Sequence, residues 1–183
     1  MRWILAVVTC ILIAGCGVAA QPESSKTVAA FEVPLRSEVD RDQFLAVLRA
    51  AAEPEGMHVD AESAQDIAQG TKVSRAFAKT MNAAVRRGAN DDEAVASAMD
   101  LPDNLGNIWL SFSKGKDPQL SARFRENAMR QIMLHWPDTL SLPIMPTGAI
   151  PLPGDLIRTS NGYLVKPSES HKYELQSTVK PGN

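Results

Sequence analysis

The chain is poor in cysteine, in aromatic residues and in positive charge. Only 5% of its 183 residues are aromatic, and 19 basic side chains face 21 acidic ones, for a net charge of −2. A protein that follows a phosphate backbone needs a basic surface, so nucleic-acid binding is not expected. The 44% of hydrophobic residues is ordinary for a globular protein, and the length suits one domain.

The chain opens with a segment unlike the rest. Arg2 supplies a positive charge, and residues 3–13 are apolar apart from Thr9 and Cys10. Small residues dominate from Gly15 onward. A basic start, a short apolar middle and a small-residue end are typical of an export signal. We therefore expect residues 1–15 to be a signal peptide and the protein to be exported.

Four residues close this segment: Ile13, Ala14, Gly15 and Cys16. They resemble the lipobox of bacterial lipoproteins. The resemblance implies that Cys16 receives a diacylglycerol thioether, that the chain is cut before it, and that its new amino group is acylated. Buried acyl chains contribute about 0.8 kcal/mol per CH₂, and stable anchoring takes more than one chain. The predicted partner of Cys16 is therefore the lipid bilayer.

The cysteine content favours this interpretation. No cysteine follows Cys16, and an exported chain with one free thiol would risk unwanted pairing in an oxidising compartment. Lipidation removes that thiol. The resemblance also implies a location: with Gly17 after the cysteine, a lipoprotein of a cell with two membranes goes to the outer membrane, facing the periplasm.

Two alternatives remain open from the sequence. Val18, Ala19 and Ala20 form an acceptable site for ordinary signal cleavage, which would release a protein beginning at Gln21. Residues 3–20 could instead remain uncut as a membrane helix, although they lie at the lower end of the ~17–25 residues that spanning requires.

The rest of the chain divides by composition. Residues 16–27 are expected to be a lipidated flexible tether, because residues 21–27 are polar and lack aliphatic side chains. Residues 28–167 are expected to form a single domain with a proline-rich arm and a C-terminal hairpin. Residues 168–183 are polar and have no core pattern, so a disordered tail is predicted.

Two strand–helix–strand units are predicted in this domain. In the first, alternating apolar residues at 31–35 and 57–61 flank a helix that begins near Ser37. In the second, strands at 107–113 and 140–144 flank a helix that begins at Asp117 and Pro118. Two such units predict an α+β sandwich, with helices on one face of a mostly antiparallel sheet. A ferredoxin-like fold with an insertion is one form of this class.

The insertion, residues 63–100, has two interpretations. Val73, Phe77, Met81 and Val85 lie four apart, as on a helix. Met81, Ala83 and Val85 also alternate, as on a strand. We favour a short helix at 63–78 followed by a hairpin whose second strand is 94–99. A further hairpin is predicted around Asn161 and Gly162, since Asn-Gly between two β-rich runs is a strong turn signal.

The only candidate catalytic residues are three polar side chains of one predicted strand. His58, Asp60 and Glu62 occupy alternate positions, so they project from one face and could bind a divalent ion or move a proton. The alternative is that they form the solvated side of a half-buried strand. The two other histidines, His135 and His171, are distant in sequence. We expect no cofactor.

A proline-rich arm, residues 143–153, is the candidate partner-binding segment. Extended proline-rich segments have little conformational freedom to lose on binding. Ile144, Met145, Ile150 and Leu152 could then contact another envelope protein, an assembly component, or a secreted toxin that the chain neutralises. The alternative is an arm packed across its own domain. An envelope hydrolase, or a protein that binds a small ligand or a glycan, is the competing functional hypothesis.

Overall fold

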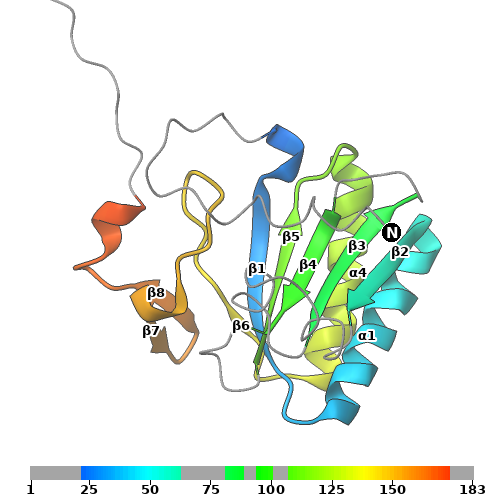
Figure 1. Cartoon of the computed structure of the whole chain (residues 1–183), viewed down its shortest axis with the longest axis horizontal. Helices are drawn as coiled ribbons and strands as arrows, with labels where there is room; N and C mark the ends of the chain where they lie inside the picture. Colours follow the sequence, from blue (N-terminus) through cyan, green and yellow to red (C-terminus); the bar gives the residue numbers. More distant parts are fainter. Residues whose placement is uncertain (1–21, 63–80, 89–93, 101–106, 174–183) are drawn as a thin grey trace, which may run out of the picture.

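A computed structural model describes residues 22–62, 81–88, 94–100 and 107–173. They form a six-stranded sheet, two long helices and a separate two-stranded hairpin (Figure 1). The sheet strands are β1 (Thr27–Pro34), β2 (Met57–Glu62), β3 (Asn82–Arg87), β4 (Ala94–Met99), β5 (Asn107–Ser113) and β6 (Leu140–Ser141). The helices are α1 (Glu38–Ala52) and α4 (Pro118–His135), and the hairpin consists of β7 (Leu156–Thr159) and β8 (Gly162–Val165).

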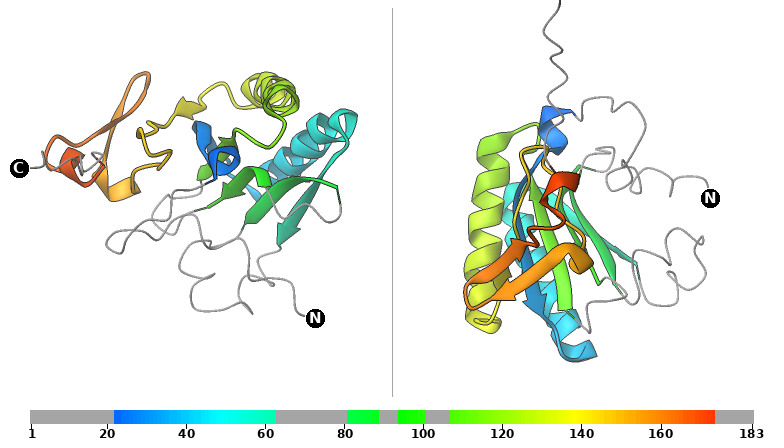
Figure 2. Two further views of the ribbon diagram at one scale, coloured as in Figure 1. Left: turned by 90° about the horizontal axis from the view of Figure 1, so that it is seen from above. Right: turned by 90° about the vertical axis from the view of Figure 1, so that its left-hand side faces the viewer.

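The strand order confirms the predicted α+β class. The order is β2-β3-β4-β5-β1-β6, and every neighbouring pair is antiparallel. Helix α1 connects β1 to β2, which lies at the far edge of the sheet. Helix α4 connects β5 to β6, and these two strands flank β1. The order β6-β1-β5-β2 is that of a ferredoxin-like sheet, and β3 and β4 are inserted between its last two strands. Both helices cover one face of the sheet (Figure 2).

Both long helices begin where their capping residues predict. The Ser37 hydroxyl accepts a hydrogen bond from the Asp40 backbone N–H at 3.1 Å, and the Asp40 carboxylate accepts one from the Arg36 N–H at 3.0 Å. At the start of α4, the Asp117 carboxylate accepts from the Leu120 N–H at 3.1 Å. The Ser37 and Asp117 side chains satisfy backbone donors that the first helical turn leaves without partners, and the Asp40 carboxylate holds the residue that precedes the cap of α1.

The main core lies between the sheet and the helices. Alternate residues of β1 and β5 point toward α4, which places three aromatic rings in contact. The ring of Phe112 lies 6.2 Å from that of Phe31 and 5.9 Å from that of Phe124, centroid to centroid. Phe124 lies on the buried face of α4, and its side chain is fully buried. These contacts join the sheet to α4.

The insertion is a hairpin where the structure describes it. Strands β3 and β4 pair with each other, and β4 also pairs with β5, so the predicted strands are confirmed for residues 82–87 and 94–99. The helix predicted at 63–78 lies outside the described residues. In the described part of the chain, no helix is both long enough and apolar enough to cross a bilayer.

Both ends of the described chain differ from expectation. Of the tether predicted over residues 16–27, residues 16–21 lie outside the described part; in the rest, η2 (Glu23–Ser25) is a 3-10 turn and β1 begins at Thr27. The backbone N–H groups of Lys114 and Gly115 donate to the carbonyls of Lys26 and Ser24, at 2.9 and 2.7 Å. These backbone hydrogen bonds hold residues 24–26 against the end of β5. The segment is polar, so no apolar pattern in the sequence predicts that it is ordered.

The C-terminal segment also carries structure where disorder was expected. Residues 170–172 form a 3-10 turn, η5 (Ser170–Lys172). The Tyr173 hydroxyl then donates to the Asp155 carboxylate, and Lys172 Nζ lies 3.2 Å from the same group. One aromatic hydroxyl and one lysine thus attach this end of the chain to the residues before β7. The predicted tail beyond 173 lies outside the described residues.

Candidate functional site

His58, Asp60 and Glu62 lie on β2, the edge strand farthest from β6. They project from the face of the sheet opposite the helices, because their neighbours Met57 and Val59 belong to the main core. His58 Nε2 lies 3.5 Å from an Asp60 carboxylate oxygen. Arg86 Nε lies 3.4 Å from that oxygen, and Glu62 accepts a hydrogen bond from Asn82 at 2.8 Å.

These contacts describe an ion-pair network of an edge strand more closely than a catalytic centre. His135 lies in the helical layer, with its ring nitrogen Nδ1 3.0 Å from Gln43 Nε2. Within residues 22–62, 81–88, 94–100 and 107–173, no three His, Cys, Asp or Glu side chains are placed to hold a metal ion. The described residues therefore bring His58 and Asp60 together, but not with Glu62 or His135.

The proline-rich arm packs mainly against its own domain. Ile144 and Ile150 contact a second apolar cluster, which consists of Ala30, Trp109, Leu142 and Leu156. Met145 is half-buried, and its backbone N–H donates to the Ala149 carbonyl at 2.9 Å. Of the four predicted partner-binding residues, only Leu152 is largely exposed, at 56% of its full surface. The exposed apolar surface begins where the arm ends.

Two further exposed apolar residues lie on the β7–β8 hairpin, which extends beyond the β6 edge (Figure 1). Ile157 and Leu164 are cross-strand partners, 46% and 62% exposed, and we call this pair the hairpin patch. Their neighbours Tyr163 and Val165 pack against the second apolar cluster. The patch was not predicted from the sequence. Its signal is the run of adjacent apolar residues in each hairpin strand, because neighbouring residues of a strand point to opposite faces and one of them must lie on the outer face.

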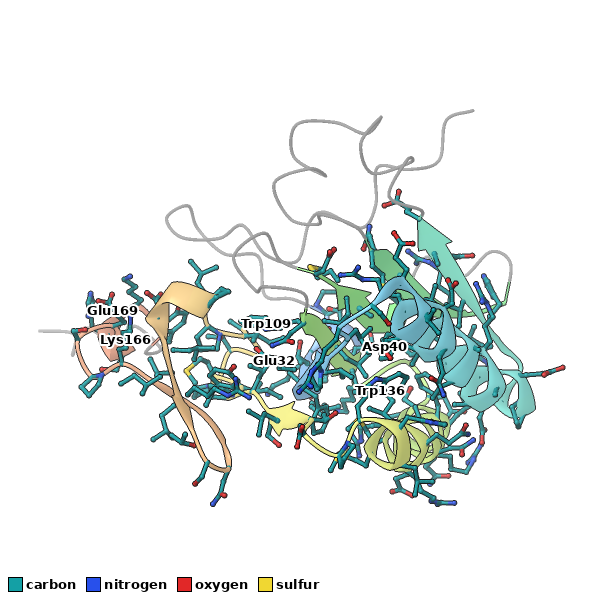
Figure 3. The ribbon with its side chains drawn as sticks, turned by 90° about the horizontal axis from the view of Figure 1, so that it is seen from below. Glu32, Asp40, Trp109, Trp136, Lys166 and Glu169 are labelled. Atoms are coloured by element: carbon teal, nitrogen blue, oxygen red, sulfur yellow. The ribbon has the colours of Figure 1, made fainter. Side chains whose placement is uncertain are left out.

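A buried carboxylate connects this hairpin to the main sheet. Glu32 of β1 is 4% exposed and accepts hydrogen bonds from Asn107 Nδ2 at 2.7 Å and Trp109 Nε1 at 3.3 Å. Its third donor is the Tyr163 hydroxyl of β8, at 2.8 Å. Figure 3 shows Glu32 and Trp109 together between the sheet and the hairpin. Donors from β5 and β8 thus converge on one carboxylate, which fixes the position of the hairpin.

Tyr163 is consequently an unusually weak acid. Burial, together with its hydrogen bond to Glu32 and the negative charge there, raises the pKa of Tyr163 to about 12. A raised pKa stabilises the fold at pH values below about 10, the ordinary tyrosine pKa. This contribution to the free energy of unfolding is lost as the pH rises toward about 12.

We expect this acidity to be measurable in a Tyr173→Phe variant, in which Tyr163 is the sole tyrosine, because the chain has two. Phenolate absorbance should rise with a midpoint near pH 12 while circular dichroism shows folded protein. In urea, the midpoint should return to about 10. A midpoint of about 10 in the folded variant would show that Tyr163 is not held against Glu32.

A cleft of about 400 Å³ opens beside this network, between the end of the sheet and the β7–β8 turn. Its walls include Asn107, the Glu32 partner, and Leu140 of β6. Arg36, Arg158 and Ser160 also line it. The cleft thus combines charged, polar and apolar groups.

Comparison of the chain with known protein families, curated proteins and solved structures gave no match.

Proposed function

We propose that this protein is a lipid-anchored component of the bacterial cell envelope that acts by binding another protein. The anchor is supported by Ile13, Ala14, Gly15 and Cys16 at the end of an export-type segment. In a cell with two membranes, Gly17 would direct it to the outer membrane, facing the periplasm. The six Cα-to-Cα steps from Cys16 to Pro22 could span at most about 20 Å, so the domain would stay close to the bilayer.

The hairpin patch is the observation that carries the binding function. Ile157 and Leu164 are exposed side by side on a hairpin whose other face packs against the domain through Leu156, Tyr163 and Val165. Single exposed aliphatic residues are common, whereas adjoining ones on a projecting element mark protein-interaction surfaces more often. The expected partner is an envelope or secreted protein with an apolar surface of its own.

The rigidity of the hairpin supports this role. The Tyr163 hydroxyl of β8 donates a hydrogen bond to Glu32 of β1. At the base of the hairpin, Lys166 Nζ donates to the Gly154 carbonyl at 2.5 Å. Gly162 packs so closely on β6 that an added Cβ would lie 2.7 Å from the Ser141 carbonyl oxygen. A surface held in one conformation loses little entropy on binding, which favours affinity.

Site-specific photo-crosslinking in the producing cell tests this proposal. A photoreactive residue at position 164 should give one discrete crosslinked species, because that side chain would lie in the interface. The matched control is position 134, a leucine that is 78% exposed on α4 in the helical layer. Crosslinking from position 134 should be absent or diffuse.

A substitution at the same place gives an independent result. Leu164→Asp should prevent crosslinking from position 157, since it places a charge in an apolar contact, and Leu134→Asp should not. The binding proposal fails if positions 164 and 134 behave alike, or if Leu164→Asp leaves the crosslinked species unchanged.

A further inference from the structure

The cleft beside the hairpin is distinct from the hairpin patch. It opens where β1 ends, where β5 begins, and where β7 turns into β8. Arg158 and Tyr163 are cross-strand partners and therefore share the hairpin face that turns toward the sheet. The patch residues Ile157 and Leu164 lie on the other face. A ligand in the cleft and a partner on the patch would thus contact different sides of the hairpin.

Two guanidinium groups give this cleft its charge. In the described part of the chain, the Arg158 side chain makes no hydrogen bond or ion pair. It lies close enough to Tyr163 that its charge opposes the rise in the pKa of that hydroxyl. Arg36 approaches Asp138 at 3.8 Å, with side chains 80% and 74% exposed. An ion pair so exposed and so long contributes little, so the Arg36 guanidinium can turn to a ligand.

The remaining walls are suited to a small organic ligand. Asn107 is fixed by its 2.7 Å bond to the buried Glu32, so the polar wall keeps one geometry. Leu140 adds apolar surface, and Ser160 adds a hydroxyl. The volume of about 400 Å³ falls within the range of about 300–1,000 Å³ that is common for small-molecule sites.

From this arrangement we infer that the cleft binds a small molecule bearing an oxyanion, a carboxylate or a phosphate, with Arg36 and Arg158 as its charged contacts. Guanidinium groups present paired N–H donors whose geometry matches both oxyanions. Asp138 at the mouth disfavours a second anionic group on the outer side of the ligand. The inference does not depend on lipid anchoring or on partner binding.

The test is an NMR titration of the full-length chain, purified in uncharged detergent. Inorganic phosphate and acetate are the two probes, added separately at constant ionic strength. Saturable shifts are expected at Asn107, Leu140 and Ser160 with at least one probe, and the tighter probe identifies the preferred oxyanion. Added salt should weaken the binding, because it screens exposed charges.

Three variants test whether Arg36 and Arg158 bind the oxyanion probe. Arg158→Gln and Arg36→Gln should each weaken the preferred probe by about tenfold, the effect of losing one charged hydrogen bond. Arg130→Gln, at an exposed position of α4, should leave the affinity unchanged. The inference is overturned if neither probe saturates, or if all three variants bind as the parent chain does.

Discussion

Serine in place of Cys16 is expected to leave the protein without lipid and to release it from the membrane. In the proposed lipoprotein the lipid would be attached through a thioether, and a serine hydroxyl is a far weaker nucleophile than a cysteine thiol. Cleavage before position 16 should also fail if it follows lipid transfer, so the variant should accumulate with its signal segment. The expected parent product begins at Cys16 and is heavier than its polypeptide by the attached acyl groups.

The control for this experiment is Cys10→Ser. Cys10 lies in the segment that cleavage before Cys16 would discard, so its substitution should change neither the mature mass nor the membrane fraction. Intact mass spectrometry and detergent-phase partitioning measure both properties. A mature chain that begins at Gln21 would support ordinary signal cleavage, and an uncut chain would support a membrane helix. Either result would end the lipoprotein proposal.

Phe124→Ala should cause the largest loss of stability among single substitutions in α4. Phe124 is fully buried and its ring contacts that of Phe112 in a tilted arrangement, and Phe112 in turn contacts Phe31 of β1. Removing its ring forfeits burial and leaves a cavity between α4 and the sheet, which costs about 3–5 kcal/mol. Domains of this size are stable by about 5–15 kcal/mol, so the variant should lose a large part of its margin.

Urea denaturation followed by circular dichroism measures this loss. Leu134→Ala is the matched control, because Leu134 lies on the same helix and is 78% exposed. It should change the free energy of unfolding by less than about 0.5 kcal/mol. Equal effects of the two substitutions would mean that α4 does not present Phe124 to the sheet.

Much of the fold could be predicted from local patterns. Ser37 and Asp117 mark helix starts because a cap depends on residues three positions apart, and that spacing is visible in the sequence. The alternation over β5 and the apolar stripe of α4 likewise predict which faces are buried. The two repeated units then indicate the ferredoxin-like arrangement that the strand order confirms.

The candidate sites depended on contacts that local patterns do not contain. The alternation of β1 suggests that Glu32 faces solvent. In the structure Glu32 is buried, and its carboxylate accepts a hydrogen bond from Tyr163, which lies 131 positions away in the chain. The sequence left open whether the arm is available to a partner or packed across its own domain, and the structure packs Ile144 and Ile150 against the second apolar cluster.

Sequence alone therefore determined the helix starts and the α+β class, and it is the sole basis of the predicted export signal and of the lipid site proposed at Cys16. Each of these depends on residues that are close together in the chain. Tertiary structure alone decided that Glu32 is buried, that Ile157 and Leu164 form the exposed patch, and that Arg36 and Arg158 border one cleft. The physical reason is that burial and charge proximity are set by which distant segments pack together, and a strand's own alternation specifies only its two faces.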